Sequence, residues 1–339
     1  MTPDDWRVGM DYRALGRSGL KVSQICLGTM NFGMPGWGCD RAEAGRIVKV
    51  FRDAGGNFFD TADVYGGGAS EEILGTLLRS ERDEVVIATK VGLPTGADAN
   101  ARGTSSKHIQ TAVEGSLRRL GVDYIDLYQV HHFDHHVPLE ETMGALERLV
   151  NAGKVRYIGS SNFYAWQIAD AANVALDCGV SPFISAQMMF NLVRRDIERE
   201  HVDVCQRYGL GIVAYGPLHA GLLAAGWTTR DEIPSNSRVA QVPEVYLADE
   251  ARVFSVTRAL VDHARQASVR PGQLALAWVL RQKGVSAALT AALTAEELED
   301  QLCSLAVEVD NAIWMSLDRA TQLPASYPQD FYQRQAERT

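Results

Sequence analysis

The stretch Phe59-Asp60-Thr61-Ala62-Asp63-Val64-Tyr65-Gly66 runs from an apolar segment into a glycine-rich loop. It places a carboxylic acid and a phenol five residues apart, where a buried strand is expected to end. A phenol is a poor proton donor at neutral pH because its unperturbed pKa is about 10. A nearby ammonium group can lower that pKa, and a carboxylate can hold the ammonium in place. The stretch therefore predicts a proton-transfer site at the end of a strand.

The next two apolar segments end in the groups that this chemistry needs. Lys90 closes one of them and His131 closes the other. The carboxyl ends of barrel strands share one face, so Asp60, Tyr65, Lys90 and His131 are expected to meet there. Taken alone, Asp60 and Lys90 could simply be a buried ion pair that closes the barrel. The four residues together are a more specific signal than any one of them, because Lys and Asp are the groups needed to lower the pKa of a Tyr phenol. We therefore interpret them as catalytic.

Apolar segments and helical patterns alternate along the whole chain. Eight such alternations predict a parallel sheet and fit an α/β fold of the (β/α)8 TIM-barrel type. A doubly wound open sheet is the alternative, but it normally carries GxGxxG after its first strand, and residues 27–33 read LGTMNFG instead. The expected strands are residues 22–28, 57–62, 85–91, 125–131, 155–160, 183–189, 211–215 and 286–290. The expected helices are near residues 41–54, 70–80, 106–120, 140–152, 165–176, 197–208, 272–282 and 295–306.

Three segments lie outside this alternation. Residues 11–22 predict an N-terminal β-hairpin before the barrel. Residues 219–249 predict a long irregular loop after the seventh strand, of the kind that forms lids or binding loops. An extra helix is expected over residues 250–267. With no linker or repeat in the chain, residues 1–339 are expected to form a single domain.

Composition excludes several classes of protein. With 33 basic and 42 acidic residues the net charge is -9, which argues against nucleic-acid binding. The five cysteines form no CxxC pair, so a disulfide framework or cysteine zinc site is not expected and a cytoplasmic location fits. Residues 1–6 do not resemble a signal peptide, and no apolar run reaches the roughly 18 residues of a membrane span.

The segment His-His-Phe-Asp-His-His at residues 131–136 invites a metal interpretation. Zinc needs three or four convergent ligands, whereas adjacent residues on a strand point to opposite faces. His131 and His132 therefore cannot both face inward, and no metal is expected.

Polar and aromatic side chains end three later strands. Ser161, Asn162 and Gln187 carry hydroxyl and amide groups that could bind the carboxamide of a nicotinamide ring. Ser161 or Asn162 could equally be an ordinary N-cap of the next helix. Tyr215 could stack on a flat cofactor ring, or it could be a core aromatic residue.

Taken together, these motifs resemble the aldo-keto reductase superfamily. The resemblance runs from the hairpin near Gly16 to about Leu305 and rests on FDTADVYGGG, EEILGTLL, Thr89-Lys90, DLYQVH, GKVRYIGSSNF and AYGPL. It implies a TIM barrel that binds NADP(H) or NAD(H) without a Rossmann domain. It also implies hydride transfer between cofactor and substrate.

The resemblance also implies a role for each matching residue. Tyr65 would be the general acid, Lys90 paired with Asp60 would lower the Tyr65 pKa, and His131 would orient the substrate carbonyl. Ser161, Asn162 and Gln187 would hold the nicotinamide carboxamide, and Tyr215 would stack on the ring. Further residues would lie along the cofactor: Gly28, Thr29 and Met30 beside it, and Gly216, Pro217, Leu218, Gly221 and Leu222 in the loop that covers the pyrophosphate.

The adenosine end departs from the family pattern. The family usually has Gly-Ala after the eighth strand, then Arg or Ser, then Gln or Arg, and then Asn. Here Ala291 and Ala292 stand at the Gly-Ala pair, Leu293 replaces Arg or Ser, Glu297 replaces Gln or Arg, and Gln301 replaces Asn. A carboxylate repels a 2′-phosphate but can accept a hydrogen bond from a ribose hydroxyl. These residues favour NAD, whereas the family as a whole favours NADP.

The predicted function is therefore an NAD(P)-dependent oxidoreductase that interconverts a carbonyl and an alcohol. Its expected substrate pocket comprises Trp37, Tyr65, His132, Phe133 and Phe163. One alternative is a cofactor-binding partner protein of the potassium-channel β-subunit type, with little turnover. Another is a metal-dependent barrel hydrolase that uses His131 and its neighbours. Substrate, direction of reaction and oligomeric state are not encoded in these motifs.

Overall fold

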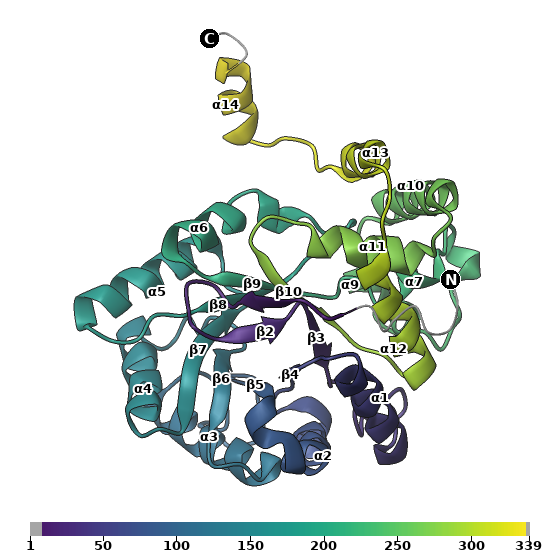
Figure 1. The fold of residues 1–339 in the computed structure, drawn as a ribbon. Coiled ribbons are helices and arrows are strands. Elements are labelled where there is room, and N and C mark those ends of the chain that lie inside the picture. The colour runs from purple at the N-terminus through teal and green to yellow at the C-terminus, as the bar shows by residue number, and fades with distance from the viewer. Residues whose placement is uncertain (1–8, 337–339) are drawn as a thin grey trace.

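Eight parallel strands close into a barrel in the order β10-β3-β4-β5-β6-β7-β8-β9 (Figure 1). The structure is a computed structural model, and it describes residues 9–336. Because β10 pairs with both β3 and β9, the sheet has no open edge, which confirms the TIM barrel and excludes the doubly wound sheet. The strands are β3 (Ile25–Gly28), β4 (Phe58–Asp60), β5 (Val86–Val91), β6 (Ile125–Val130), β7 (Val155–Ser161), β8 (Ser185–Met189), β9 (Gly211–Tyr215) and β10 (Val285–Thr290).

Helices surround the barrel, as the alternating pattern predicts (Figure 1). Helix α3 shows why they begin and end where they do: Ser105 accepts a hydrogen bond from the backbone N–H of His108, and Gly121 ends the helix with positive φ. The eight helices that alternate with the strands are α1 (Arg41–Asp53), α2 (Ala69–Leu78), α3 (Ser106–Leu120), α4 (Leu139–Asn151), α5 (Ala165–Cys178), α6 (His201–Tyr208), α11 (Pro271–Leu280) and α12 (Ala295–Leu302).

The interior of the barrel is apolar at its N-terminal end and polar at its C-terminal end. Phe58, Ala88 and Leu127 belong to one inner apolar cluster. Because side chains two residues apart on a strand share a face, the next inward positions are Asp60, Lys90 and Gln129. The strand register thus places a layer of polar side chains above an apolar floor.

The predicted hairpin forms and closes the N-terminal end of the barrel. Its strands are β1 (Tyr12–Ala14) and β2 (Lys21–Ser23), and Leu15 and Val22 pack into the inner apolar cluster. The expected single strand over residues 22–28 is wrong, since β2 ends at Ser23 and β3 begins at Ile25. The Ser23 hydroxyl donates to the carbonyl oxygen of Ile25 at 2.6 Å, which turns the chain between the two strands.

Residues 219–249 are less irregular than expected. They contain the short helices α7 (Leu222–Ala225), α8 (Arg238–Gln241) and α9 (Pro243–Tyr246), and the predicted extra helix follows as α10 (Glu250–Ala267). Two further helices, α13 (Asn311–Thr321) and α14 (Gln329–Ala336), were not anticipated, and α14 extends away from the barrel (Figure 1).

Two sequence-based expectations are not decided by this fold. The absence of a signal peptide concerns residues 1–6, which lie outside the described residues, and the single domain over 1–339 stays a prediction. Within residues 9–336, no helix has both the length and the apolar character needed to cross a bilayer.

Candidate functional site

Four strands contribute to a hydrogen-bonded group centred on the carboxylate of Asp60. Lys90 donates from Nζ to Oδ1 of Asp60, and the Nε2 groups of Gln129 and Gln187 donate to Oδ2 at 2.9 and 2.8 Å. All four side chains are buried. The charges are tolerated there because they are paired and further hydrogen-bonded. Gln129 did not stand out in the sequence, although it shares the inward face with His131 two residues later.

Tyr65 lies beside this group, at the start of a 3₁₀ turn, η2 (Tyr65–Gly68). Its hydroxyl is 3.3 Å from Nζ of Lys90, which also donates to the carbonyl oxygen of Thr61 at 2.9 Å. Burial disfavours the ammonium form of Lys90, but Asp60 and Tyr65 together raise the Lys90 pKa above its ordinary value. Lys90 is therefore a cation, held next to the phenol.

Burial raises the pKa of Tyr65. Lys90 lowers it, as expected, but the net shift of that pKa is upward. Desolvation of the phenolate outweighs the attraction of one ammonium whose charge is largely compensated by Asp60. The phenol of Tyr65 is therefore protonated at neutral pH.

His131 follows β6 and contacts Tyr65 edge-on, with ring centroids 5.9 Å apart. Burial, and then the charge of Lys90, lower the pKa of His131 to about 3, so its imidazole is neutral. Its Nδ1 is buried without a hydrogen-bond partner. The ring can therefore serve as a neutral hydrogen-bonding group beside the phenol.

The ends of β7 and β9 form a second polar contact. The Asn162 amide donates to the carbonyl oxygen of His131 at 3.0 Å and to Ser161 Oγ at 3.1 Å, and it accepts from the Tyr215 hydroxyl at 2.8 Å. Helix α5 has Tyr164 as its N-cap, so the capping alternative for Ser161 and Asn162 is wrong. Tyr215 is half-buried and hydrogen-bonded, which does not fit a core aromatic residue.

The loop after β9 has a strained backbone. His219, Ala220 and Gly221 have φ of +50°, +55° and +89°, and positive φ is uncommon for residues other than glycine. His219 is held by contact between its Nε2 and the carbonyl oxygen of Tyr246 at 2.8 Å. The side chains of the expected cofactor residues Pro217, Leu218 and Leu222 are buried. Gly216, which has positive φ, has no side chain, so this loop would contact a ligand mainly through its backbone groups.

The end of β3 lies next to β4 and β10. A side chain at Gly28 would meet Leu289, at 2.6 Å from its Cδ2 atom. The Thr29 hydroxyl contacts the Asp60 carbonyl oxygen at 3.1 Å and Ser70 Oγ at 2.9 Å, so it is already satisfied. Of the three expected residues, only Met30 has a substantially exposed side chain.

After β10, the expected adenosine-end residues bind one another. Glu297 accepts a hydrogen bond from the backbone N–H of Leu293 at 2.7 Å. Gln301 donates to the carbonyl oxygen of Ala291 at 2.9 Å and accepts from Thr290 at 2.7 Å. The carboxylate of Glu297 is thereby fixed beside the exposed Leu293 side chain.

The expected substrate-pocket residues fall into two groups. Phe133 packs edge-on against Phe163, with ring centroids 5.2 Å apart, and also against the exposed Trp166, which sequence reasoning missed. The Phe163 ring is buried between Phe133 and Phe183, and its place in a substrate pocket stays a prediction. His132 contacts the carbonyl oxygen of Phe133 through Nδ1 at 2.9 Å.

Trp37 has a different neighbour, Arg238, which did not stand out in the sequence. The guanidinium of Arg238, on α8, stacks over the Trp37 ring at 5.1 Å. Its Nε is buried and has no hydrogen-bond acceptor. A buried guanidinium N–H without an acceptor is unusual in a folded protein and marks a place where an anion could bind.

The histidine-rich segment does not gather metal ligands. The His135 ring packs on Phe133 at 4.9 Å, and across residues 9–336 no three His, Cys, Asp or Glu side chains converge as a metal site.

Comparison with known proteins shows the family of the chain. The sequence profile of the "Aldo/keto reductase family" matches residues 24–322. The chain is 35% identical to "Uncharacterized oxidoreductase YrpG" of Bacillus subtilis (strain 168), covering 91% of this chain and 95% of the relative. It is 35% identical to "Versiconal hemiacetal acetate reductase" of Aspergillus parasiticus, covering 80% and 85%. It is also 36% identical to "Probable voltage-gated potassium channel subunit beta" of Oryza sativa subsp. japonica, covering 88% and 92%. Both the profile and the relatives' names support an oxidoreductase, and the chain belongs to the aldo/keto reductase family.

Proposed function

We propose that this protein is an NAD(P)-dependent oxidoreductase that interconverts an aldehyde or ketone and an alcohol, with Tyr65 as its general acid and base. The observation that carries the proposal is the contact of 3.3 Å between the Tyr65 hydroxyl and the Lys90 ammonium, which is paired with Asp60. Membership of a family that generally uses NAD(P)H on small carbonyl and alcohol substrates supports it.

In reduction, the Tyr65 hydroxyl would donate a proton to the carbonyl oxygen of the substrate. Lys90 would stabilise the phenolate that remains, and Asp60 would keep Lys90 charged and in place. Neutral His131 would direct the carbonyl oxygen towards Tyr65 by a hydrogen bond. A bound nicotinamide would supply the hydride.

The residues of this structure fit a nicotinamide dinucleotide. The amide of Asn162, after β7, and the half-buried ring of Tyr215, at the end of β9, are hydrogen-bonded to each other and would offer a carboxamide-bearing ring polar and stacking partners. The side-chain amide of Gln187 already donates to Asp60, so it would have to keep this hydrogen bond while it also binds the carboxamide. Arg238, with its unsatisfied Nε, would bind a phosphate of the dinucleotide.

The β10–α12 loop favours NAD(H) over NADP(H). Glu297 and Glu296 place two carboxylates near the start of α12, and the nearby Arg46 is already paired with Glu43 and Glu296. A 2′-phosphate would meet negative charge there, whereas a ribose hydroxyl could donate to Glu297. Titration of nicotinamide fluorescence with NADH and NADPH tests this, and tighter binding of NADPH would overturn the preference.

For the substrate, we propose a pocket made by Trp37, Tyr65, His132 and Phe133, together with the exposed Trp166. The ring contacts of Phe133 form an aromatic wall on the loop that follows His131. Such a wall suits an aromatic or other apolar carbonyl compound. A cytoplasmic location and the absence of nucleic-acid partners stay predictions.

The test of the proposal is Tyr65→Phe. The variant keeps the ring but lacks the proton, so we expect kcat to fall by about 10²–10⁴-fold with unchanged cofactor affinity. Turnover of aldehydes and affinity for the dinucleotide are measured on the same preparations. Full activity in the variant would refute the role of Tyr65, and binding of neither dinucleotide to the wild type would refute the proposed function.

A second candidate function is that of a cofactor-bearing partner protein. Two relatives are described as probable voltage-gated potassium channel β subunits, and their similarity covers most of this chain. That role predicts negligible wild-type turnover over many carbonyl compounds despite tight dinucleotide binding, together with partner binding that survives Tyr65→Phe.

A further inference from the structure

A second cluster of buried polar groups lies behind the Tyr65 loop, outside the barrel wall. Glu71 of α2 is fully buried, accepts from Thr89 Oγ1 at 2.6 Å and is paired with Arg119 of α3 at 2.6 Å. Arg119 lies against the glycine turn of that loop, because a side chain at Gly68 would meet its Cδ at 2.6 Å. The cluster is thus physically connected to the segment that carries Tyr65.

Asp63 belongs to this cluster but has no hydrogen-bond partner for its side chain. Its exposure is only 3%, and both carboxylate oxygens are buried without a hydrogen bond of normal geometry. The backbone N–H of Val64 is close enough to favour the ionised form, but it is the weakest influence on the pKa of this carboxyl group. The backbone N–H of Asp63 donates to the carbonyl oxygen of Lys90 at 3.3 Å, which fixes the residue beside the proposed catalytic lysine. The hydroxyl of Tyr128, on the outer face of β6, is likewise buried and unbonded. Buried polar atoms are nearly always satisfied, so such a group needs a functional or chemical explanation.

Charged and titratable groups act on Asp63 from every neighbouring element. Glu71 on α2 disfavours its ionised form, while Arg119 on α3 and Lys90 on β5 favour it. Tyr65 on its own loop and Tyr128 on β6 also interact with Asp63. Burial dominates, followed by Glu71, and raises the pKa of Asp63 to about 7.

We propose that Asp63 is a positioning residue: its buried carboxyl group, fixed beside Lys90, exchanges a proton and thereby alters the electrostatic field on Tyr65 and Lys90. This inference rests on the proposed function of Tyr65. An ionised Asp63 raises the pKa of Tyr65, whereas a neutral Asp63 does not. Proton transfer by Tyr65 would therefore respond to pH through a group that never touches the substrate.

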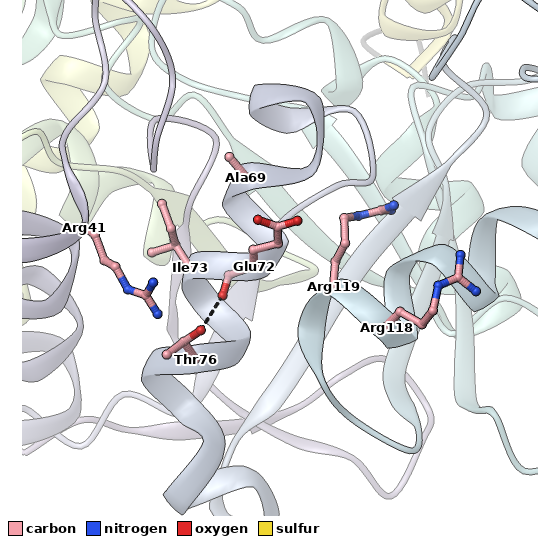
Figure 2. Close-up of a pocket in the computed structure, with 7 residues that line it drawn as sticks. All are labelled: Arg41, Ala69, Glu72, Ile73, Thr76, Arg118 and Arg119. Atoms are coloured by element: carbon pink, nitrogen blue, oxygen red, sulfur yellow. Dashed lines mark hydrogen bonds between the residues drawn. The ribbon is translucent and has the colours of Figure 1, made fainter.

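The position of Arg119 explains how the cluster stays closed. Figure 2 shows a surface hollow between α1, α2 and α3, with Arg119 and Glu72 among its lining residues. This hollow measures about 690 Å³. Glu71 does not line this hollow: its side chain is fully buried, and its carboxylate accepts a hydrogen bond from Arg119. Solvent thus reaches Arg119 but not the carboxylates behind it.

The first experiment measures the carboxyl group directly. In cofactor-free protein labelled with ¹³C at the aspartate γ-carbons, we expect one resonance to titrate near pH 7. It should be lost in Asp63→Asn, which imitates the neutral form without changing shape. Should that variant fail to fold, Tyr128→Phe provides the assignment, because Asp63 and Tyr128 interact and the same resonance should shift. If no aspartate titrates near neutral pH, the inference is wrong.

The second experiment follows ionisation of Tyr65 by ultraviolet absorbance, assigned with Tyr65→Phe. In Asp63→Asn the pKa of Tyr65 should fall, and the pH profile of kcat should lose its inflection near neutral pH. The matched control is Glu72→Gln, which removes a neighbouring but exposed carboxylate (Figure 2). An unchanged Tyr65 titration in Asp63→Asn, or an equal effect of Glu72→Gln, would overturn the inference. Both titrations are independent of turnover, so their success with an inactive wild type would reject only the proposed function.

Discussion

The carboxylate of Asp60 accepts hydrogen bonds from three side chains within the protein. One of its oxygens accepts from Lys90 and the other accepts from Gln129 and Gln187. This arrangement compensates the charge of Lys90 and so limits how far the ammonium can lower the pKa of Tyr65. The pKa values of the site residues thus depend on how deeply each group is buried and on how well its charge is paired. Asp63 is buried but, unlike Asp60, is not paired with a cation.

Asp63 should make the stability of the fold depend on pH. Its pKa is about 7 in the folded protein and 3.8 in the reference state, so the folded form binds the proton more tightly. Stability from this group is fully present below about pH 4 and is lost as the pH rises through 7, by roughly 4 kcal/mol. Urea unfolding from pH 4 to 8 should show this loss in the wild type relative to Asp63→Asn. A constant difference between the two proteins over that range would contradict the assignment.

At the scale of elements, the N-terminal hairpin depends on one glycine. Gly16 has φ of +61°, and a side chain there would lie 2.4 Å from the carbonyl oxygen of Ile184 and 2.5 Å from that of Gly209. The hairpin turn is therefore pressed directly onto the backbone that leads into β8 and β9. Its neighbour Gly19 has ordinary φ and open space around it.

These two glycines form a matched pair for mutation. We expect Gly16→Ala to destabilise the protein by about 3 kcal/mol, because it combines backbone strain with a clash against main-chain atoms. Gly19→Ala should change stability by less than about 1 kcal/mol. Urea denaturation of both variants gives the comparison, and equal stabilities would show that the hairpin does not pack as described.

In the molecule as a whole, the segment after β9 runs from the C-terminal end of β9 to the loop after β3. It leaves β9, is held by the contact of His219 with Tyr246, and reaches the loop after β3 through Arg238 on Trp37. Since β10 lies between β9 and β3 in the barrel, this segment passes the end of β10. It therefore lies next to the proposed dinucleotide site.

Arg238 should contribute to dinucleotide affinity. Replacing it with Gln removes a charged donor whose Nε has no acceptor within the protein. We expect Kd for the dinucleotide to rise about 10- to 100-fold, which corresponds to one lost charge-assisted hydrogen bond. Nicotinamide fluorescence titration measures it, with Arg230→Gln as control, since Arg230 on the same segment is exposed and paired with Glu250. Equal affinities in the two variants would remove Arg238 from the site.

The order of strands and the residues at their ends follow from local patterns in the sequence. Alternating apolar runs specify the barrel, and parallel strands must end at the same face, so Asp60, Lys90 and His131 could be placed together without coordinates. The turn at Gly16 and the helix over 250–267 were also visible, because glycine placement and helical periodicity are local signals.

Only the tertiary structure decided how charged these residues are and what they contact. Gln129 and Arg238 acquire their partners from distant segments, and Phe163 is buried by Phe183. Burial also outweighs the expected effect of Lys90 on the pKa of Tyr65. The surroundings that set the pKa of Asp63 include Glu71, Arg119 and Tyr128, which come together only in the folded protein. The burial of a group and the charges that act on it depend on all residues that surround it in space. Spacing along the chain does not show which residues these are.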